Sequence, residues 1–162
     1  MRRIGLISDT HGLLRPEAIE ALRGSHHIVH AGDIGDPAIL DRLASLAPVT
    51  AVRGNNDVGE WTRTLHDTAE LEVDGVRIHV RHDRGVLDHA RRATDVVVSG
   101  HSHKPSVTTV DGTLYVNPGS AGPRRFKLPV AVGELTISHG KATARIIELE
   151  VAPPARAPRR RR

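Results

Sequence analysis

The sequence predicts an α/β fold in which two mixed β-sheets pack face to face, with helices on the outside. Short runs rich in Ile and Val, each about one strand long, recur along the chain. In the first half these runs alternate with helical stretches, and in the second half they form pairs around tight turns. Alternation favours parallel βαβ units and pairing favours antiparallel hairpins, so we expect both kinds of strand pairing.

The expected strands of the βαβ part each end in a polar cluster. They are Ile4–Ser8, His27–His30, Val49–Arg53, Val76–Val80, Val96–Ser99 and Leu114–Val116. Helical spacing of apolar residues predicts three helices, at Pro16–Arg23, Pro37–Leu46 and Arg84–Ala93. Pro16 suits the first turn of a helix, where its missing N–H has no partner to lose.

Three dipeptides typical of two-residue hairpin turns punctuate the chain: Asp74-Gly75, Asp111-Gly112 and His139-Gly140. Each is flanked by apolar runs of strand length. The predicted hairpins therefore pair Ala69–Val73 with Val76–Val80, Val107–Val110 with Thr113–Val116, and Val130–Ser138 with Lys141–Val151.

The composition excludes several classes of site. The chain has no cysteine, which rules out disulfides, thiolate metal sites and cysteine nucleophiles. It has only three aromatic residues, so the core must be aliphatic and a stacking platform for single-stranded nucleic acid is disfavoured. No apolar run approaches the roughly 20 residues needed to cross a bilayer, and the stretch before Asp9 is too short for a signal peptide. We therefore expect a cytoplasmic protein.

The positive charge is concentrated at the C-terminus. Lys and Arg number 23 against 19 Asp and Glu, and Arg156 and Arg159 to Arg162 lie in the final segment. Without those five arginines the rest of the chain is nearly neutral. Ala152–Arg162 contains only Pro, Ala and Arg and is expected to be disordered. The sequence thus predicts one domain over residues 1–151, followed by a tail over 152–162.

Six polar clusters directly follow expected strands. Because the carboxyl ends of such strands meet at one edge in α/β folds, we expect these clusters to form a single site. The clusters are Asp9-Thr10-His11-Gly12, Gly32-Asp33, Gly54-Asn55-Asn56-Asp57, Arg81-His82-Asp83, Gly100-His101-Ser102-His103 and Asn117-Pro118-Gly119-Ser120.

Their side chains offer oxygen and imidazole ligands without sulfur, a set that suits Mn²⁺, Fe²⁺, Co²⁺, Ni²⁺ or Zn²⁺. Taken singly, several clusters also fit ordinary turns or surface histidines. Their common position at strand ends favours a metal site. Seven ligands are too many for one ion and suit two ions about 3.5–4 Å apart that share a carboxylate. The candidates are Asp9, His11, Asp33, Asn55, His82, His101 and His103.

In this order, the clusters closely resemble those of the calcineurin-like metallophosphoesterase superfamily. The short length and the Asn117–Ser120 element resemble its small bacterial and archaeal phosphodiesterase branch, and the resemblance covers about residues 3–150. It implies a four-layer α/β/β/α sandwich with a dinuclear metal centre. Position by position, it assigns one ion to Asp9, His11 and His103, the other to Asn55, His82 and His101, and the bridge to Asp33.

The resemblance also implies hydrolysis of a phosphodiester by a metal-bound hydroxide, with Asp33, Asn55 and His11 in the catalytic centre and manganese as the first expected metal. We expect Asn56, Arg124 and Arg125 to contact the substrate, the arginines through their planar guanidinium groups; the alternative for the two arginines is a solvated surface pair. The chain departs from the family twice. Asn56 stands where many larger members have a histidine that protonates the leaving group, and His82-Asp83-Arg84 replaces a frequent His-Gly-His.

Two other functions remain open from the sequence. The same fold serves as a protein-interaction scaffold in Vps29-type retromer subunits, although a scaffold has little need of a complete ligand set. A nuclease could hold nucleic acid with the arginine tail, but the neutral body and few aromatic residues make this the less favoured alternative. Both a monomer and a homodimer are compatible with the sequence.

Overall fold

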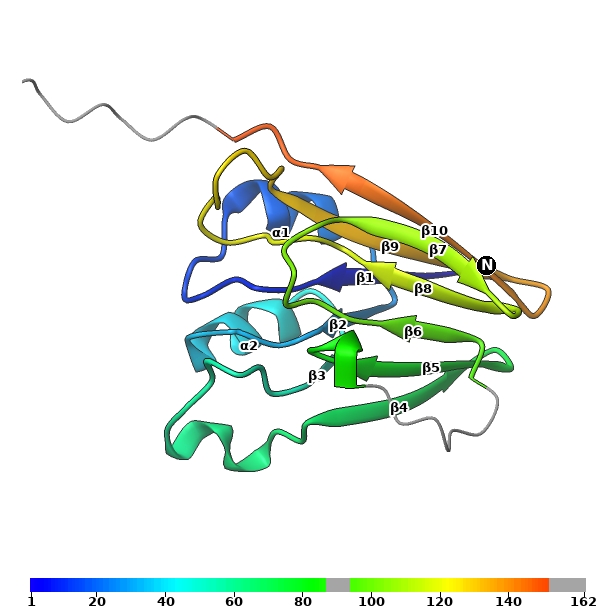
Figure 1. Cartoon of the computed structure of the whole chain (residues 1–162), viewed down its shortest axis with the longest axis horizontal. Helices are drawn as coiled ribbons and strands as arrows, with labels where there is room; N and C mark the ends of the chain where they lie inside the picture. The colour runs from blue at the N-terminus through cyan, green and yellow to red at the C-terminus, as the bar shows by residue number, and fades with distance from the viewer. Residues whose placement is uncertain (87–93, 152–162) are drawn as a thin grey trace, which may run out of the picture.

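The computed structural model describes residues 1–86 and 94–151, which form two mixed five-stranded sheets (Figure 1). The first sheet has the order β10-β9-β1-β2-β3. Its strands β1, β2 and β3 are parallel, and β9 and β10 are added as an antiparallel hairpin beside β1. Their bounds are β1 Arg2–Ile7, β2 His27–His30, β3 Val49–Ala51, β9 Ala131–Ser138 and β10 Lys141–Glu148.

The second sheet has the order β4-β5-β6-β8-β7, with β5, β6 and β8 parallel and the outer strands antiparallel to their neighbours. Its bounds are β4 Thr68–Val73, β5 Val76–Arg81, β6 Val96–Val98, β7 Ser106–Val110 and β8 Thr113–Asn117. At each predicted hairpin turn, both residues have positive φ, as a two-residue turn of this type requires. The predicted α/β class with two mixed sheets and the three hairpins are confirmed.

Side chains alternate between the two faces of each strand, so the first sheet contributes to two apolar layers. One lies between the two sheets, and the other lies between the first sheet and the helices. In β1, Ile4 and Leu6 point towards the second sheet, whereas Ile7 points towards the helices. Among the described residues, the buried apolar side chains between the sheets are all Ile, Leu, Val or Ala, for example Val29, Ile78, Val80 and Leu135. The aliphatic core expected from the shortage of aromatic residues is therefore present.

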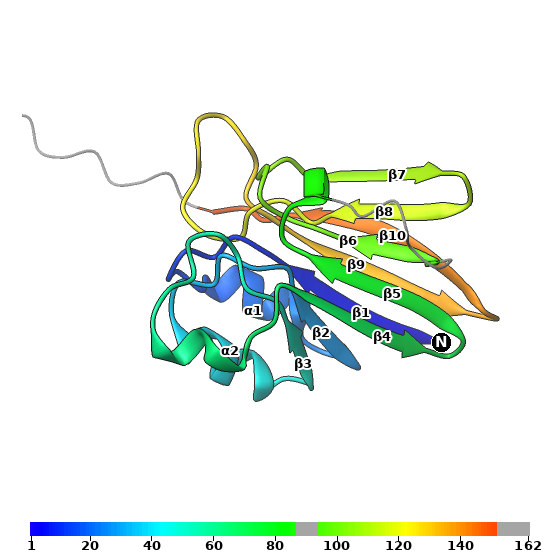
Figure 2. The same ribbon diagram turned by 60° about the horizontal axis from the view of Figure 1, so that its bottom comes forward.

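Two helices, α1 (Pro16–Leu22) and α2 (Pro37–Ala44), cover the outer face of the first sheet (Figures 1 and 2). The Asp36 side chain caps α2 by accepting a hydrogen bond from the amide of Ala38. The helix ends two residues before the predicted Leu46, in a turn around Ser45. The structure also has a short 3₁₀ helix that was not predicted, η1 (Glu60–Thr64).

The predicted third helix, Arg84–Ala93, falls largely outside the described residues. Its described part is a 3₁₀ turn, η2 (Arg84–Val86). The tail predicted to be disordered, 152–162, also lies outside them. Among the helices that the structure does describe, none has the length and apolar character required to cross a membrane.

Glu134 on β9 provides a test of how charge stabilises the first sheet. The residue is 8% exposed, and its carboxylate accepts hydrogen bonds from the guanidinium groups of Arg3 and Arg145. Burial alone would raise the pKa of Glu134, but the two arginines outweigh it and hold the pKa below the usual value. A carboxylate of this kind stabilises the fold above the unfolded-state pKa of about 4.3, and the stabilisation is lost as the pH falls through the lower folded-state pKa.

We therefore predict that Glu134→Gln lowers the free energy of unfolding by about 1 kcal/mol at pH 7, a value kept small because Arg145 is largely exposed. Urea denaturation should show this difference shrinking as the pH is lowered from about 4.3. Glu148→Gln, on the exposed side of β10, is the matched control and should have almost no effect. A Glu134→Gln difference that is independent of pH would contradict the prediction.

Candidate metal centre

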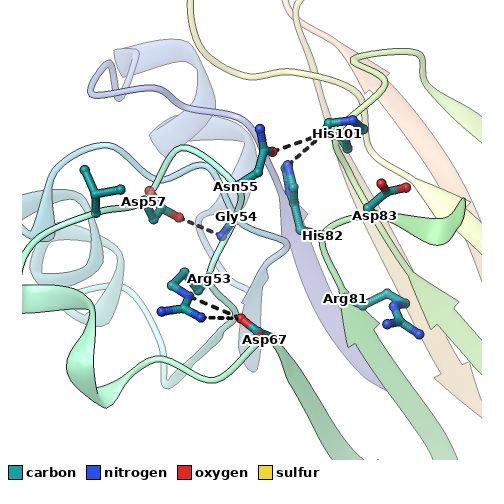
Figure 3. A pocket seen from close by; sticks show the side chains of 10 residues that line it. Arg53, Gly54, Asn55, Asp57, Asp67, Arg81, His82, Asp83 and His101 are labelled. Atoms are coloured by element: carbon teal, nitrogen blue, oxygen red, sulfur yellow. Dashed lines mark hydrogen bonds and ion pairs between the residues drawn. The ribbon is translucent and has the colours of Figure 1, made fainter. Parts of the chain in front are cut away.

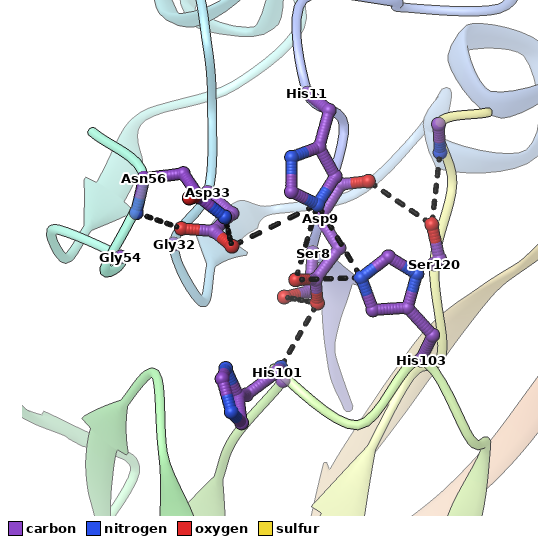
Figure 4. A network of polar contacts seen from close by, with 12 residues as sticks. Ser8, Asp9, His11, Gly32, Asp33, Gly54, Asn56, His101, His103 and Ser120 are labelled. Atoms are coloured by element: carbon purple, nitrogen blue, oxygen red, sulfur yellow. Dashed lines mark hydrogen bonds and ion pairs between the residues drawn. The ribbon is translucent and has the colours of Figure 1, made fainter. Parts of the chain in front are cut away.

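The loops after β1, β2, β3, β5 and β6 meet where the two sheets present the carboxyl ends of their parallel strands (Figure 4). Two sets of three residues there could each hold a metal ion, and they share Asp9. Within each set, the ligand atoms lie within 4.8 Å of one another. The sets are Asp9, His11 and His103, and Asp9, Asp33 and His82. We call Asp9, His11 and His103 the first ligand group, and Asn55, His82 and His101 the second. Asp33 lies between them.

In the first ligand group, two imidazoles face one buried carboxylate oxygen. Asp9 Oδ1 lies 3.3 Å from His103 Nε2 and 3.7 Å from His11 Nε2, and these two nitrogens are 3.3 Å apart. Asp9 Oδ1 is buried without a hydrogen-bond partner among the described residues, whereas Oδ2 accepts from the Ser8 hydroxyl and the His101 amide. A buried oxygen without a donor is costly. A divalent cation between the three side chains would satisfy it.

In the second ligand group, His82 Nδ1 donates to the Ala31 carbonyl over 2.8 Å, so the lone pair of the neutral ring is on Nε2. That nitrogen lies 3.3 Å from His101 Nδ1, which is itself 3.2 Å from Asn55 Oδ1. Nitrogen and oxygen lone pairs therefore converge here as well. These donor atoms fit a second divalent ion of the kind that imidazole and oxygen ligands prefer.

Asp33 Oδ2 faces one histidine from each group. It is 3.3 Å from His82 Nε2 and 3.7 Å from His11 Nε2. The backbone amide of Asn56 donates to Asp33 Oδ1 and its side-chain amide to Oδ2, which fixes the carboxylate in this orientation. This is the position that a carboxylate shared by two ions requires.

The protonation states of Asp33 and His103 suit metal ligands. Burial lowers the pKa of His82, but its contact with Asp33 and the charge of Asp9 outweigh burial and raise that pKa above the usual value. Burial raises the pKa of Asp33, but its contacts with His82 and Asn56 outweigh burial and hold that pKa far below the usual value. Burial lowers the pKa of His103 below its usual value, and the positive charge of Arg125 adds to this. At neutral pH, Asp33 is therefore a carboxylate and His103 a neutral imidazole.

Five of the seven candidate ligands have strained backbones. Asp9, His11, Asp33, His101 and His103 all have φ between 46° and 71°, in the left-handed region that non-glycine residues rarely adopt. Each such residue costs on the order of 1 kcal/mol, and such strain is typical of functional sites. Apart from these five, positive φ in described non-glycine residues is confined to the three hairpin turns and Phe126.

Hydrogen bonds hold the loops after β1 and β2 together. His30 Nδ1 accepts from the Gly32 amide, so its Nε2 carries the proton and donates to Thr10 Oγ1 over 3.0 Å. The Thr10 hydroxyl in turn donates to the carbonyl of Ile34. Burial, with His82 nearby, lowers the pKa of His30 to about 3, so the ring stays neutral. His30 thereby orients the neighbours of His11 and Asp33.

Asp57 has a supporting role that the sequence analysis did not assign. It is 4% exposed, and its carboxylate accepts from the backbone amides of Ile34, Gly35 and Gly54. An Asp that closes a Gly-containing turn is a local signal for the Gly54 contact. The other two contacts join residues 22 and 23 positions apart, for which the sequence holds no local signal. Asp57 thus ties the Asn55 loop to the Asp33 loop.

Asn117 and Ser120 anchor the remaining loops. The Asn117 side-chain amide donates to the Gly100 carbonyl and to Ser102 Oγ, which secures the segment carrying His101 and His103. The Ser120 hydroxyl donates to the carbonyl of Asp9 over 3.0 Å. Both residues belong to the predicted Asn117–Ser120 cluster, and both support ligands without belonging to either ligand group.

The three predicted substrate contacts lie in different environments. Asn56 is bound to both oxygens of Asp33, as described above. Arg124 and Arg125 are exposed on the loop that follows Ser120, and Arg125 is near enough to His103 to influence its pKa. That these residues contact a substrate stays a prediction.

A groove of about 550 Å³ opens beside the second ligand group (Figure 3). Asn55, His82 and His101 form the wall next to the metal centre, and Arg53, Asp67 and Asp83 are among the residues that line the rest. Its volume is within the range of about 300–1,000 Å³ that is typical of small-molecule sites.

Comparisons with known proteins agree with this geometry. The family model described as a calcineurin-like phosphoesterase superfamily domain matches residues 1–140. A probable metallophosphoesterase of Methanothermobacter thermautotrophicus is 36% identical over 158 residues, covering 89% of this chain and 91% of the relative.

Two solved structures have the same fold. One, described as a novel archaeal phosphodiesterase, has a TM-score of 0.74 and 26% identity, and the match covers 90% of this chain and 99% of that one. Vps29 of Chaetomium thermophilum has a TM-score of 0.73 and 18% identity, covering 92% and 97%. The chain therefore belongs to the calcineurin-like phosphoesterase superfamily, in its branch of small metallophosphoesterases related in fold to Vps29.

Proposed function

We propose that the protein is a phosphodiesterase that depends on two divalent metal ions. The observation that carries the proposal is Asp33 Oδ2, which faces His11 of the first ligand group and His82 of the second. The likeness to an archaeal phosphodiesterase favours a phosphodiester as the substrate.

In this proposal Asp9, His11 and His103 would hold one ion and Asn55, His82 and His101 would hold the other, with the Asp33 carboxylate between the two ligand groups. When bound, the ions supply an activated water nucleophile and positive charge that offsets the charge developing on the phosphate. The chain's own residues keep this centre in shape. Asn56 orients Asp33 through two hydrogen bonds, and Arg125 adds positive charge beside His103 for a phosphate oxygen.

Metal removal and restoration test the proposal. After chelation, hydrolysis of bis-p-nitrophenyl phosphate should fall by on the order of 10³-fold, and Mn²⁺ should restore it. The diester should be cleaved with a higher kcat/KM than p-nitrophenyl phosphate. His82→Asn should stay inactive after metal is added, whereas His139→Asn, at the distant β9–β10 turn, should respond like the parent protein.

Failure to cleave either ester with Mn²⁺, Ni²⁺, Fe²⁺, Co²⁺ or Zn²⁺ would contradict the proposal and favour the scaffold function. The preference for manganese, the cytoplasmic location, the choice between monomer and homodimer and a nucleic-acid role for the tail stay predictions.

A further inference from the structure

We propose that the groove beside the second ligand group binds one ester group of the substrate and selects a hydroxyl-rich group, such as a polyol or a sugar. This inference rests on the proposed phosphodiesterase function and extends it to a substrate class. It arises from the position of the groove, from the hydrogen-bonding atoms on its wall and from the chemical groups that this wall does not suit.

The groove is continuous with the proposed catalytic centre. Asn55, His82 and His101 line it, so a phosphate held between the two ligand groups has the groove on the side of the second group (Figure 3). A phosphodiester carries two esterified alcohol groups. Hydrolysis releases one of them, and the other stays attached to the phosphate. With a volume of about 550 Å³, the groove is large enough for the other.

The wall of the groove offers donors and acceptors side by side. Arg53 donates from Nε and Nη2 to a single oxygen of Asp67, Oδ1. In the described part of the chain, Arg53 Nη1 and Asp67 Oδ2 have no hydrogen-bond partner, and both side chains are exposed. Asp83 accepts from the Gly85 amide through Oδ1, and its Oδ2 is likewise unpaired among these residues. A hydroxyl group both donates and accepts, which this mixture matches.

Other ester groups fit this wall less well. The groove lining has two arginines, Arg53 and Arg81, and three carboxylates, those of Asp57, Asp67 and Asp83, so it has no excess positive charge for a second phosphate. Val58 is the one apolar side chain on the described wall, too little to bury a lipid chain. Among the described residues, no Phe, Tyr or Trp lines the groove to stack on a nucleobase.

Two synthetic diesters that differ only in their hydroxyl groups test the inference. These are p-nitrophenyl glyceryl phosphate and p-nitrophenyl propyl phosphate, which share the leaving group, the charge and the length of the second ester group. We expect the Mn²⁺-loaded protein to hydrolyse the glyceryl ester with a kcat/KM about tenfold above that of the propyl ester. A choline ester with the same leaving group tests a cationic group in the same place.

Asp83 provides the matched variants. Asp83→Gly, which introduces the residue frequent in the family, should bring the glyceryl-to-propyl ratio close to one, and Asp83→Asn, which keeps one acceptor oxygen, should retain part of it. The control Asp111→Asn, at the β7–β8 turn, should keep both the ratio and the activity. Because both rates are measured on the same sample, loss of metal in a variant lowers both rates together and does not by itself change the ratio.

Equal efficiency towards the glyceryl and propyl esters in the parent protein would overturn the inference and leave the phosphodiesterase function intact. A preference for the choline ester would also overturn it, because the carboxylates would then select a cation. An unchanged ratio in Asp83→Gly would show that Asp83 does not select the hydroxyl groups, and it would overturn the inference. Failure to hydrolyse any of the three diesters would instead contradict the proposed function itself.

Discussion

Replacing Asp33 by Asn is expected to lower kcat for bis-p-nitrophenyl phosphate by on the order of 10³-fold and to release bound metal. The carboxylate is the group between the two ligand groups, and its pKa is held far below the usual value, so it carries a negative charge at neutral pH. An amide keeps the shape but loses the charge and one of the two oxygens. Metal content after dialysis, measured by mass spectrometry beside the kinetics, checks both effects.

Asp9→Asn separates the bridging role from that of an ordinary ligand. Asp9 Oδ1 faces both histidines of the first ligand group, at 3.3 and 3.7 Å, and lies farther, at 3.8 Å, from His82, whereas Asp33 Oδ2 faces one histidine of each group. We therefore expect Asp9→Asn to lose one ion and Asp33→Asn to lose both. Asp41→Asn, on the exposed side of α2, is the control and should bind two ions. The opposite pattern of metal loss would transfer the bridging role to Asp9.

Asp57→Ala is expected to lower the free energy of unfolding of the metal-free protein by about 3 kcal/mol. The substitution removes the acceptor of three backbone amides, and two of these contacts, with Ile34 and Gly54, are buried. Since these amides belong to the loops that carry Asp33 and Asn55, Mn²⁺ affinity should also fall, by about 10- to 100-fold. Urea denaturation and titration calorimetry measure the two effects.

Asp57→Asn retains one acceptor oxygen and should recover part of both losses. An Asp57→Ala variant with parental stability and parental Mn²⁺ affinity would contradict the prediction, because it would show that water replaces the carboxylate without cost. A loss of stability with unchanged Mn²⁺ affinity would restrict Asp57 to a role in folding.

The sequence predicted those parts of the fold that depend on near neighbours. The hairpin turns at Asp74-Gly75, Asp111-Gly112 and His139-Gly140 require positive φ at both residues, and residues of these types adopt it readily. The start of α2 could also be predicted from adjacent residues, because it depends on the Asp36 cap and on Pro37 in the first turn. In contrast, the pairing of β9 with β1 joins residues more than 120 positions apart, and no local pattern indicates it.

The candidate site shows the same division. The ligand types and their positions after strands could be identified because strand ends carry a clear polar signal, as in Gly32-Asp33. The supporting contacts could not, since they depend on how two loops approach each other. Gly54 illustrates this: a Cβ added there would lie 2.1 Å from Asp33 Oδ1, so only glycine fits, yet in sequence it is indistinguishable from an ordinary turn glycine.

Each ligand group draws side chains from both sheets. Asp9 and His11 follow β1 and Asn55 follows β3 in the first sheet, whereas His82, His101 and His103 follow strands of the second. The spacing between the sheets, set by side chains such as Leu6 and Val80, therefore also sets the spacing of the ligands. Substitutions in this aliphatic layer are then constrained by metal geometry as well as by stability. As such a sequence diverges, exchanges that conserve volume between the sheets should be tolerated far better than those that widen or narrow the gap.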